Sequence, residues 1–359
     1  MGEDFCVLAI KTEFLQTKIA VYKQGSLVFL KTIVHAQEQL AAFKVNTDQY
    51  EFRGMAIWDE LSHACVEACC IKIIMARGGL LKPIPSGIYE VNEAMKQDLH
   101  NSPYGRHSVN IGGLAADWLT TKIPGAKAYI ADPAVVDELC DLARYTGFPD
   151  VKRTSIFHAL NHKYVARRFS QTTRRAYEDM NLIVAHLGDG ISIGAHKHGK
   201  VVDVNQCFDG EGPFSLERAG SIPMIDLIKM CYSGKYPQSQ ILTMIRNEGG
   251  LFAYLGSSDV YEIEKAEQSK NTEVLEIFEA MAYQIAKYIG YMAPVFAAPV
   301  DAILITGMLA NNKWFTSLII ERVKFIAPVQ IFPGEDVLDA LAMNANLLLK
   351  EEVSVLIYQ

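Results

Sequence analysis

The pattern of hydrophobic and polar positions in the first half of the chain predicts three consecutive strands, followed by alternating helices and strands. Alternating apolar residues around a turn at 23–26 indicate an antiparallel start to a sheet. Apolar positions three or four residues apart then indicate helices. In chain order, the predicted elements are strands 5–10, 17–22 and 27–33, a helical region 48–68, strand 71–76, helix 107–120, strand 128–131 and a helix after Pro133.

The same order of elements begins again after about residue 180. Two blocks that each open with hairpin strands and then alternate helix and strand predict a duplicated mixed α/β unit, although no repeat is visible at the level of residues. The predicted elements here are strands 182–186, 191–196 and 200–204, helices 224–232, 239–247 and 272–295, strand 300–305, and helices 311–323 and 334–349.

Composition narrows the class of protein. A length of 359 residues suggests roughly two or three domains, and 50% hydrophobic residues are enough for a large core. A net charge of −7 argues against a nucleic-acid partner, which needs a clustered basic surface. The N-terminal MGEDFCVLAI lacks a basic region followed by a long apolar run, and charged residues interrupt the apolar stretch 277–300. We therefore expect a cytoplasmic protein with no membrane partner.

The seven cysteines are an odd number for a disulfide framework. Cys65, Cys69 and Cys70 cluster, and a metal site there is conceivable. No second Cys or His pair follows at zinc spacing, so buried, reduced thiols are the preferred interpretation.

Two glycine-containing turns are candidates for binding phosphate. The chain has neither a Walker A sequence nor a G-x-G-x-x-G after a strand, which disfavours P-loop and Rossmann sites. Gly188, Asp189 and Gly190 lie between predicted strands, where backbone N–H groups could approach a phosphate, although an ordinary hairpin has the same pattern. Thr306 and Gly307 end a predicted strand and could receive a nucleotide, or simply form a strand-to-helix turn.

Nine segments between residues 76 and 342 together resemble the butyrate kinases, which belong to the superfamily of acetate kinases, sugar kinases, heat-shock chaperone ATPases and actin. The segments are ARGGLLKPIPSGIYEVN (76–92), HSVNIGG (107–113), YIADPAVVDEL (129–139), SIFHALNHK (155–163), NLIVAHLGDGISIGAHKHGKVVDVN (181–205), DGEGPFSLERAGSIP (209–223), GGLFAYLGSSD (249–259), FEAMAYQIAKYIG (278–290) and VKFIAPVQIFPGEDVLDALA (323–342).

This resemblance implies an α/β fold of two duplicated actin-like (ribonuclease H-like) domains with ATP in the cleft between them. Residues 1–150, joined by a C-terminal helix over 335–359, would form the acceptor side, and 151–334 the nucleotide side. The implied activity is ATP- and Mg²⁺-dependent phosphorylation of a short carboxylic acid, butyrate or a branched acid, to an acyl phosphate, and the reverse. A homodimer or higher homo-oligomer is also implied.

The resemblance assigns roles to individual residues. Asp132 would assist phosphoryl transfer by orienting the acceptor or holding Mg²⁺, while Arg218 and His158 would stabilise the transferring phosphoryl group. A purely structural role stays open for each: Asp132 could cap a helix, Arg218 could form an ion pair, and His158 could start a helix. The remaining implied residues are Arg77, His107 and Asn110 for the acid, and Lys11, Thr17, Lys18, His186, Gly188, Asp189, Gly190, Thr306 and Gly307 for the nucleotide.

Three turns depart from the family pattern. The first phosphate loop, expected to be close to Asn-Pro-Gly-Ser-Thr-Ser-Thr-Lys, is KTEFLQTK at 11–18, and Asp189 and Met308 replace glycines. A carboxylate about 5 Å from a phosphate charge costs roughly 3 kcal/mol at an effective dielectric near 20. A catalytically impaired paralogue with a binding or regulatory role is therefore the alternative, and a sugar kinase or chaperone-like ATPase is a third possibility.

Overall fold

The computed structural model describes residues 5–359. Residues 1–4, the start of the N-terminal sequence MGEDFCVLAI, lie outside this range. The chain forms two compact units: unit 1 comprises Met1–Val136, Ala159–Asn161 and Asp336–Gln359, and unit 2 comprises Asp137–His158 and His162–Glu335. In the described part of the chain, no helix combines the length and hydropathy that a membrane span requires.

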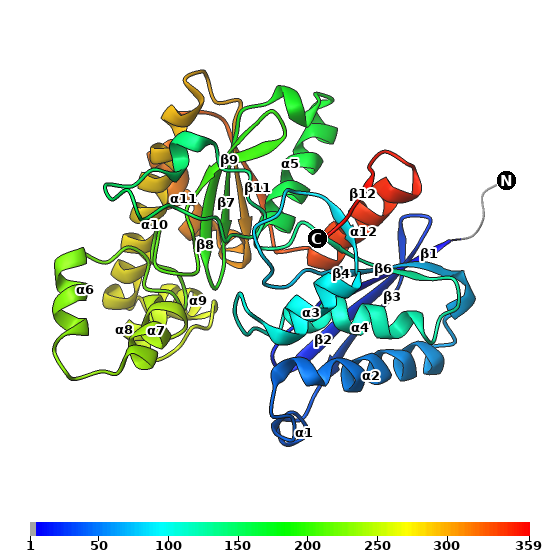
Figure 1. Cartoon of the computed structure of the whole chain (residues 1–359). Coiled ribbons are helices and arrows are strands. Elements are labelled where there is room, and N and C mark those ends of the chain that lie inside the picture. The colour runs from blue at the N-terminus through cyan, green and yellow to red at the C-terminus, as the bar shows by residue number, and fades with distance from the viewer. Residues whose placement is uncertain (1–4) are drawn as a thin grey trace. The chain divides into compact units, whose positions relative to one another are not determined.

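Unit 1 is built on a sheet of seven strands in the order β12-β5-β6-β4-β1-β2-β3 (Figure 1). The first three strands form antiparallel pairs, as the alternating pattern predicts, and β4 and β6 then add parallel to β1. The strands are β1 (Cys6–Thr12), β2 (Gln16–Lys23), β3 (Ser26–Val34), β4 (Ile71–Arg77), β5 (Ile88–Glu90), β6 (Lys127–Ala131) and β12 (Val355–Leu356).

Helices cover both faces of this sheet. Alternate residues of β1, including Leu8 and Ile10, pack with Ile57 and Leu61 of α2 in one hydrophobic cluster. Helix α12 contacts β1 and β4 from the opposite face. The helices of unit 1 are α1 (Gln37–Ala41), α2 (Tyr50–His63), α3 (Glu93–Asn101), α4 (Asn110–Thr120) and α12 (Val337–Leu349).

The sheet of unit 2 repeats the pairing of the first. Its order is β11-β10-β7-β8-β9, with two antiparallel pairs on one side of the first strand and two parallel pairs on the other. The core of unit 1, β6-β4-β1-β2-β3, has the same sequence of pairings, so the predicted duplication is confirmed. The strands are β7 (Leu182–Leu187), β8 (Ile191–Lys197), β9 (Lys200–Val204), β10 (Ala302–Gly307) and β11 (Val329–Pro333).

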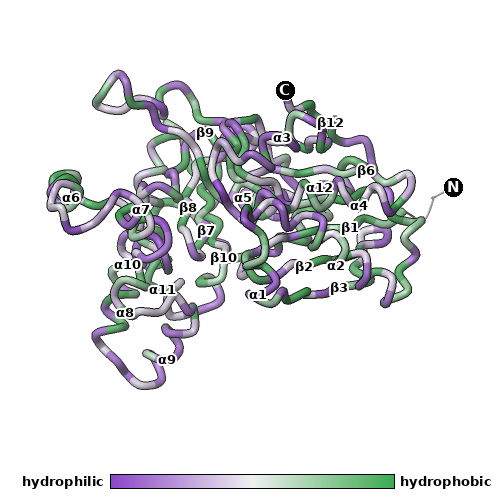
Figure 2. Tube along the Cα trace, turned by 60° about the horizontal axis from the view of Figure 1, so that its bottom comes forward, coloured by the Kyte–Doolittle hydropathy of each residue, from purple (hydrophilic) through white to green (hydrophobic). Residues whose placement is uncertain are grey.

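In unit 2, odd-numbered residues of β8 pack against α10 (Thr272–Met292) and α11 (Lys313–Val323), whereas even-numbered residues face α5 (Ala159–Thr173). Figure 1 shows α5 and α10 on opposite sides of these strands, and Figure 2 shows that the trace of β7 and β8 is largely hydrophobic. The other helices are α6 (Met224–Cys231), α7 (Gln238–Arg246), α8 (Gly250–Leu255) and α9 (Glu262–Ser269).

Several predicted elements need correction. The helix expected directly after Pro133 does not form, because the backbone there makes hydrogen bonds to another segment. Ile84 N–H donates to Val135 O, and Val136 forms an isolated parallel β-bridge with Ile84. The region 335–359 is helical only over α12 and ends in β12. The predicted series of elements contains no helix at α5, because polar residues buried in its first turns interrupt the apolar spacing; only the alternative role of His158 as a helix start pointed to it.

The cysteine cluster is also different from the expected buried thiols. Cys65 and Cys69 are exposed and Cys70 is partly exposed, all as free thiols. They lie after α2 and in the 3₁₀ turn Ala68–Cys70, outside the sheet core. Among residues 5–359, no group of three or more His, Cys, Asp or Glu side chains is placed to hold a metal ion.

Candidate active site

Two of the acceptor-side candidates, Arg77 and Asp132, lie at the carboxyl ends of neighbouring parallel strands of unit 1. Arg77 ends β4 and pairs with Ala131 of β6, so Asp132 follows directly beside it. Ligands of open α/β sheets bind at the carboxyl ends of the strands, particularly at the point where the order of the strands reverses. The two candidates therefore belong to one edge of the sheet.

Asp132 is held in an unusual backbone conformation. It is 1% exposed and has φ of 40°, although it is not glycine and precedes a proline. Such conformations are strained and persist only where surrounding contacts enforce them. Its Oδ1 accepts from the Ser86 hydroxyl at 2.6 Å and from Gly87 N–H at 3.0 Å, and its own N–H donates to Gly87 O. These bonds fix the direction of the carboxylate.

The other acceptor-side candidates have different surroundings. Arg77 is partly exposed and His107 is exposed just before α4. Asn110 is fully buried: its Oδ1 accepts from Leu80 N–H at 2.8 Å, and its amide nitrogen donates to Ser102 Oγ and Gly105 O. Asn110 therefore braces the loops around it, and direct contact with an acid stays a prediction.

The turn between β1 and β2 carries an acidic residue between the two predicted phosphate lysines. Glu13 Oε1 lies 2.7 Å from Lys11 Nζ, and Glu13 Oε2 lies 3.7 Å from Lys18 Nζ. Burial alone would raise the pKa of Glu13, but the charges and hydrogen bonds of Lys11, Gln16 and Lys18 hold it below its usual value. Glu13 is therefore ionised and compensates the positive charge of this turn.

A buried arginine, which the sequence did not single out, holds this turn from α2. Arg53 is 0% exposed, and its guanidinium donates to the carbonyl oxygens of Glu13 at 2.9 Å, Phe14 at 2.7 Å and Gln16 at 3.2 Å. It also donates to the Thr17 hydroxyl, which lies 2.9 Å from His35 Nε2. The predicted nucleotide residue Thr17 is therefore fully buried, with its hydroxyl bonded to Arg53 and His35.

In unit 2, the turn after β7 approaches a catalytic candidate very closely. Gly188 and Gly190 are buried, whereas Asp189 between them is exposed. A Cβ on Gly190 would lie 2.0 Å from Arg218 Nη1, so only glycine allows the guanidinium to lie against this turn. This close approach brings the predicted phosphate turn and Arg218 together.

Arg218 is anchored by its own loop. Its Nη1 donates to Cys207 O at 2.8 Å and to Cys207 Sγ at 3.3 Å, and the guanidinium lies 5.3 Å from the centre of the Phe208 ring. The adjacent Glu217 is affected by the exposed acid of the turn, because burial and then the Asp189 carboxylate raise the pKa of Glu217. Asp189 thus adds negative charge beside the predicted phosphate site.

The two predicted histidines meet beside this arginine. The His158 and His186 rings are stacked with centroids 3.8 Å apart, and Cys207 Sγ lies 4.0 Å from His158 Nδ1. His158 is the residue just before the first turn of α5, whereas His186 lies near the end of β7, opposite Ser192 of β8. Cys207 thus connects His158 with Arg218.

The end of β10 completes this group. Thr306 pairs with His186 across the parallel strands, and its hydroxyl donates to Gly334 O at 3.0 Å. Gly307 has φ of 97°, and a Cβ there would lie 2.3 Å from Leu187 O. Glycine is therefore required where the two strand ends meet. Met308, which stands where the family pattern has a second glycine, is the next residue.

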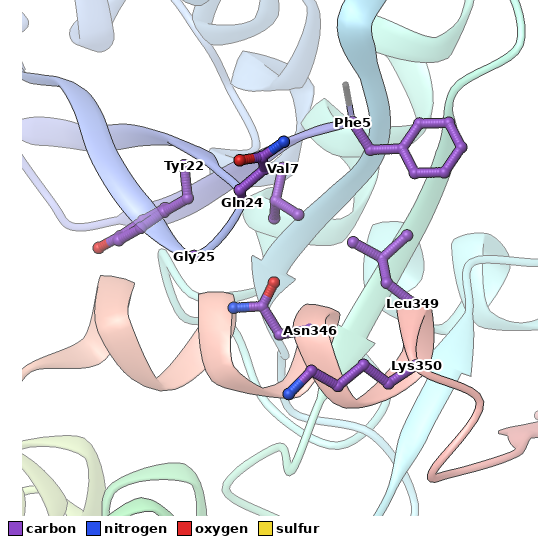
Figure 3. A pocket seen from close by; sticks show the side chains of 8 residues that line it. All are labelled: Phe5, Val7, Tyr22, Gln24, Gly25, Asn346, Leu349 and Lys350. Atoms are coloured by element: carbon purple, nitrogen blue, oxygen red, sulfur yellow. The ribbon is translucent and has the colours of Figure 1, made fainter. Parts of the chain in front are cut away.

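A further pocket lies in unit 1, between the start of β1, the β2–β3 turn and α12 (Figure 3). The Tyr22 hydroxyl at its edge donates to Asp339. None of the predicted site residues lines this pocket, so it is separate from the candidate site. Its lining residues are Phe5, Val7, Tyr22, Gln24, Gly25, Asn346, Leu349 and Lys350.

The sequence of this chain is similar to that of known proteins. The acetokinase family model matches residues 149–332. The chain is 44% identical to butyrate kinase 2 of Clostridium acetobutylicum, covering 94% of this chain and 95% of that protein. It is 43% identical to a probable butyrate kinase of Bacteroides thetaiotaomicron, covering 98% and 99%.

Solved structures agree at the level of the fold. The acetate kinase of Porphyromonas gingivalis superposes with a TM-score of 0.77 at 18% identity, over 96% of this chain and 100% of that one. A propionate kinase of Francisella tularensis gives a TM-score of 0.74 at 16% identity, over 95% and 98%. The predicted actin-like fold is confirmed. The chain belongs to the acetokinase family.

Proposed function

We propose that the protein is a carboxylate kinase that transfers the γ-phosphoryl group of ATP to butyrate or a branched short-chain acid, and catalyses the reverse reaction. The observation that carries this proposal is the packing of Arg218 against Gly190, next to the stacked pair His158 and His186. The similarity to proteins named butyrate kinases supports the choice of acid.

The reaction needs charge stabilisation more than proton transfer. An acid with a pKa near that of a glutamic acid side chain, about 4.3, is already ionised at neutral pH. Its carboxylate oxygen forms a bond to the γ-phosphorus while the bond from that phosphorus to the β–γ bridging oxygen breaks, giving acyl phosphate and ADP. In this proposal Arg218 and His158 donate hydrogen bonds to the equatorial phosphoryl oxygens, where negative charge is shared.

Asp132 is then an orienting group and not an essential base. Its carboxylate direction is fixed by Ser86 and Gly87, which suits a group that positions an acceptor or a metal-bound water. Mg²⁺ would enter with ATP as part of the substrate, and a metal held largely by phosphates and water needs few protein ligands. We assign Asp132 as its protein contact and Arg77 and His107 as acid-side residues.

The nucleotide would bind to the turns at 188–190 and 306–307 with His186, and to the β1–β2 turn with Lys11 and Lys18. Thr17, whose buried hydroxyl is bonded to Arg53 and His35, would contribute by shaping this turn. We assign residues 151–334 to the nucleotide side and residues 1–150 with 335–359 to the acceptor side, with the β1–β2 turn as the exception. Glycine turns and lysines suit polyphosphate because amide N–H groups and ammonium charges attract it.

Trapping of the acyl phosphate with hydroxylamine tests the proposal. A panel of acids from acetate to hexanoate, with isobutyrate and isovalerate, is incubated with ATP and Mg²⁺. We expect hydroxamate to form, with the highest kcat/KM for butyrate or a branched acid of similar length. Absence of hydroxamate with every acid from a folded protein contradicts the proposal.

One observation favours an alternative, a catalytically impaired paralogue with a binding or regulatory role. Glu13 neutralises Lys11 and Lys18, the two lysines of the first phosphate turn. Calorimetry with ATP and ADP separates the two functions. Micromolar nucleotide binding supports the kinase, whereas binding of acid without nucleotide supports the alternative.

We further propose that the enzyme acts in the cytoplasm as a homodimer or larger homo-oligomer. Helix α6 exposes an apolar stripe of Met224, Ile225 and Ile228, continued by Tyr232, which is 88% exposed. Contiguous exposed apolar residues commonly mark protein interfaces. Light scattering after size-exclusion chromatography tests this: a dimer that Ile228→Glu converts to a monomer supports the proposal, and a monomeric parent protein contradicts it.

A further inference from the structure

A chain of hydrogen bonds in unit 2 runs from a buried tyrosine to the active-site histidine. Tyr177 Oη lies 2.6 Å from His196 Nδ1, and His196 Nε2 lies 3.2 Å from His162 Nδ1. His162 Nε2 lies 2.9 Å from Ser192 Oγ, which lies 2.9 Å from His158 Nδ1. The first four residues of the chain are buried, and His158 is its partly exposed end.

The local fold brings these side chains into line. His158 and His162 are four residues apart across the start of α5, which places them one above the other on the same face. Ser192 and His196 lie four residues apart on β8, so they face the same side of the sheet, towards α5. The rings of His162 and His196 are stacked with centroids 5.4 Å apart.

The two inner histidines are neutral, which gives the chain a direction. Burial lowers the pKa of both His162 and His196 well below the usual value, and the nearby charge of His186 lowers that of His162 further. A neutral imidazole has one N–H donor and one acceptor nitrogen. The hydrogen bonds from Tyr177 through His196 and His162 to Ser192 therefore all point the same way, either towards His158 or away from it. The Ser192 hydroxyl can donate once and accept twice, so its other contacts decide the step to His158.

Three contacts favour donation towards His158. The phenol of Tyr177 is more acidic than a neutral imidazole N–H and is the better donor in that pair. The backbone N–H of His158 points at Ser192 Oγ at 3.5 Å, which leaves the Ser192 hydroxyl hydrogen for His158 Nδ1. Burial raises the pKa of Cys207, so its thiol keeps a hydrogen that can also point at His158 Nδ1.

We infer that Tyr177, His196, His162 and Ser192 form a one-directional donor chain that holds His158 in the tautomer with hydrogen on Nε2. His158 then accepts at Nδ1 and offers Nε2–H as its donor to the transferring phosphoryl group. The four residues are positioning residues, since they act through His158. The catalytic part of this inference rests on the proposed kinase function, whereas the tautomer does not.

Nuclear magnetic resonance of the protein labelled with [¹⁵N]histidine tests the tautomer without any turnover. The His158 signals are identified as those lost in His158→Asn. We expect a pyrrole-type signal for Nε2 and a pyridine-type signal for Nδ1. A pyrrole-type Nδ1, or two nitrogens averaged by rapid exchange, overturns the inference even if acyl phosphate is formed.

Removal of the first donor tests the direction of the chain. Tyr177→Phe keeps the aromatic ring that the Lys163 ammonium faces at 5.8 Å but removes the hydroxyl. We expect the His158 signals to move towards averaged values and kcat to fall about five- to tenfold, the scale of one hydrogen bond, with KM for ATP and acid unchanged. Tyr22→Phe removes a similar buried hydroxyl, the donor to Asp339, and should leave both readouts unchanged.

The outcomes separate the two proposals. Unchanged His158 signals and unchanged kcat in Tyr177→Phe overturn the donor chain while the kinase function stands. If Tyr177→Phe does not fold, Ser192→Ala provides the same test at the contact with His158, with a larger expected loss of kcat. If the parent protein forms no acyl phosphate, the kinase function fails, and the spectrum still decides the tautomer.

Discussion

Substitution of Arg53 should loosen the turn that carries the first phosphate residues. Arg53 is fully buried and its guanidinium donates to three carbonyl oxygens of the turn and to Gln49 Oε1. In Arg53→Met these acceptors lose their donor together. A buried acceptor without a partner costs about 1–3 kcal/mol, and the losses within one network are not additive. We therefore expect unit 1 to lose about 3–5 kcal/mol of unfolding free energy.

Arg53→Lys should cause a smaller loss. A lysine keeps the positive charge but lacks the planar fork that reaches several carbonyl groups at once. We expect a loss of about 2 kcal/mol, between the parent and the methionine variant. Both variants should also raise KM for ATP more than KM for the acid, because the turn carries Lys11 and Lys18.

Urea unfolding followed by tryptophan fluorescence measures the unfolding free energy of unit 1. Trp58 and Trp118 lie in unit 1 and Trp314 lies in unit 2, so a Trp314→Phe background reports unit 1 alone. Lys127→Met is the control in unit 1, because its exposed ion pair with Glu90 should contribute less than about 1 kcal/mol. An unfolding midpoint and a KM for ATP in Arg53→Met equal to those of the parent would refute the role of Arg53.

Three further predictions concern the β1–β2 turn, the turn after β7, and His35, which contacts Thr17. Glu13→Gln should tighten ATP binding roughly tenfold or more, because it frees the charge of Lys11 and Lys18; weaker binding in calorimetry would show that Glu13 supports the nucleotide. Gly190→Ala should lower kcat by about a hundredfold with unchanged circular dichroism, because the added Cβ displaces the Arg218 guanidinium; an active Gly190→Ala would exclude that contact from catalysis. Burial, with the Arg53 charge, lowers the pKa of His35 from 6.5 to about 4. Unfolded His35 thus takes up a proton near pH 6.5 while folded His35 stays neutral, so its contribution of up to about 3 kcal/mol is complete above pH 6.5 and lost as the pH falls through 4. His35→Gln should flatten this part of a stability–pH profile, and an unaltered slope would contradict the assignment.

The sequence predicted the duplicated sheets because strand alternation and hairpin turns are local signals. It also led to His158, His186, Arg218 and the turn at 188–190, which the structure brings together. It did not identify Arg53, because its role depends on carbonyl groups of a turn about forty residues earlier, and backbone acceptors carry no sequence signal.

The histidine chain behind His158 was missed for a different reason. His162 and His196 are 34 residues apart, and only the packing of α5 against β8 makes them neighbours. A signal existed in the four-residue spacings 158–162 and 192–196, which place each pair on one face of its element. Spacing alone, however, does not distinguish such a network from ordinary buried polar residues.

The prediction of a helix after Pro133 was wrong because hydrogen bonds to another segment outweighed the local helical pattern there.

The stoichiometry of one reaction tests the central claim most directly. The protein is incubated with ATP, Mg²⁺, butyrate and hydroxylamine, and ADP and butyryl hydroxamate are quantified together. Transfer to the carboxylate predicts equal amounts of both products, and a loss of roughly a thousandfold in Arg218→Ala. ADP without hydroxamate, or neither product from a folded protein, would contradict the assignment as a carboxylate kinase.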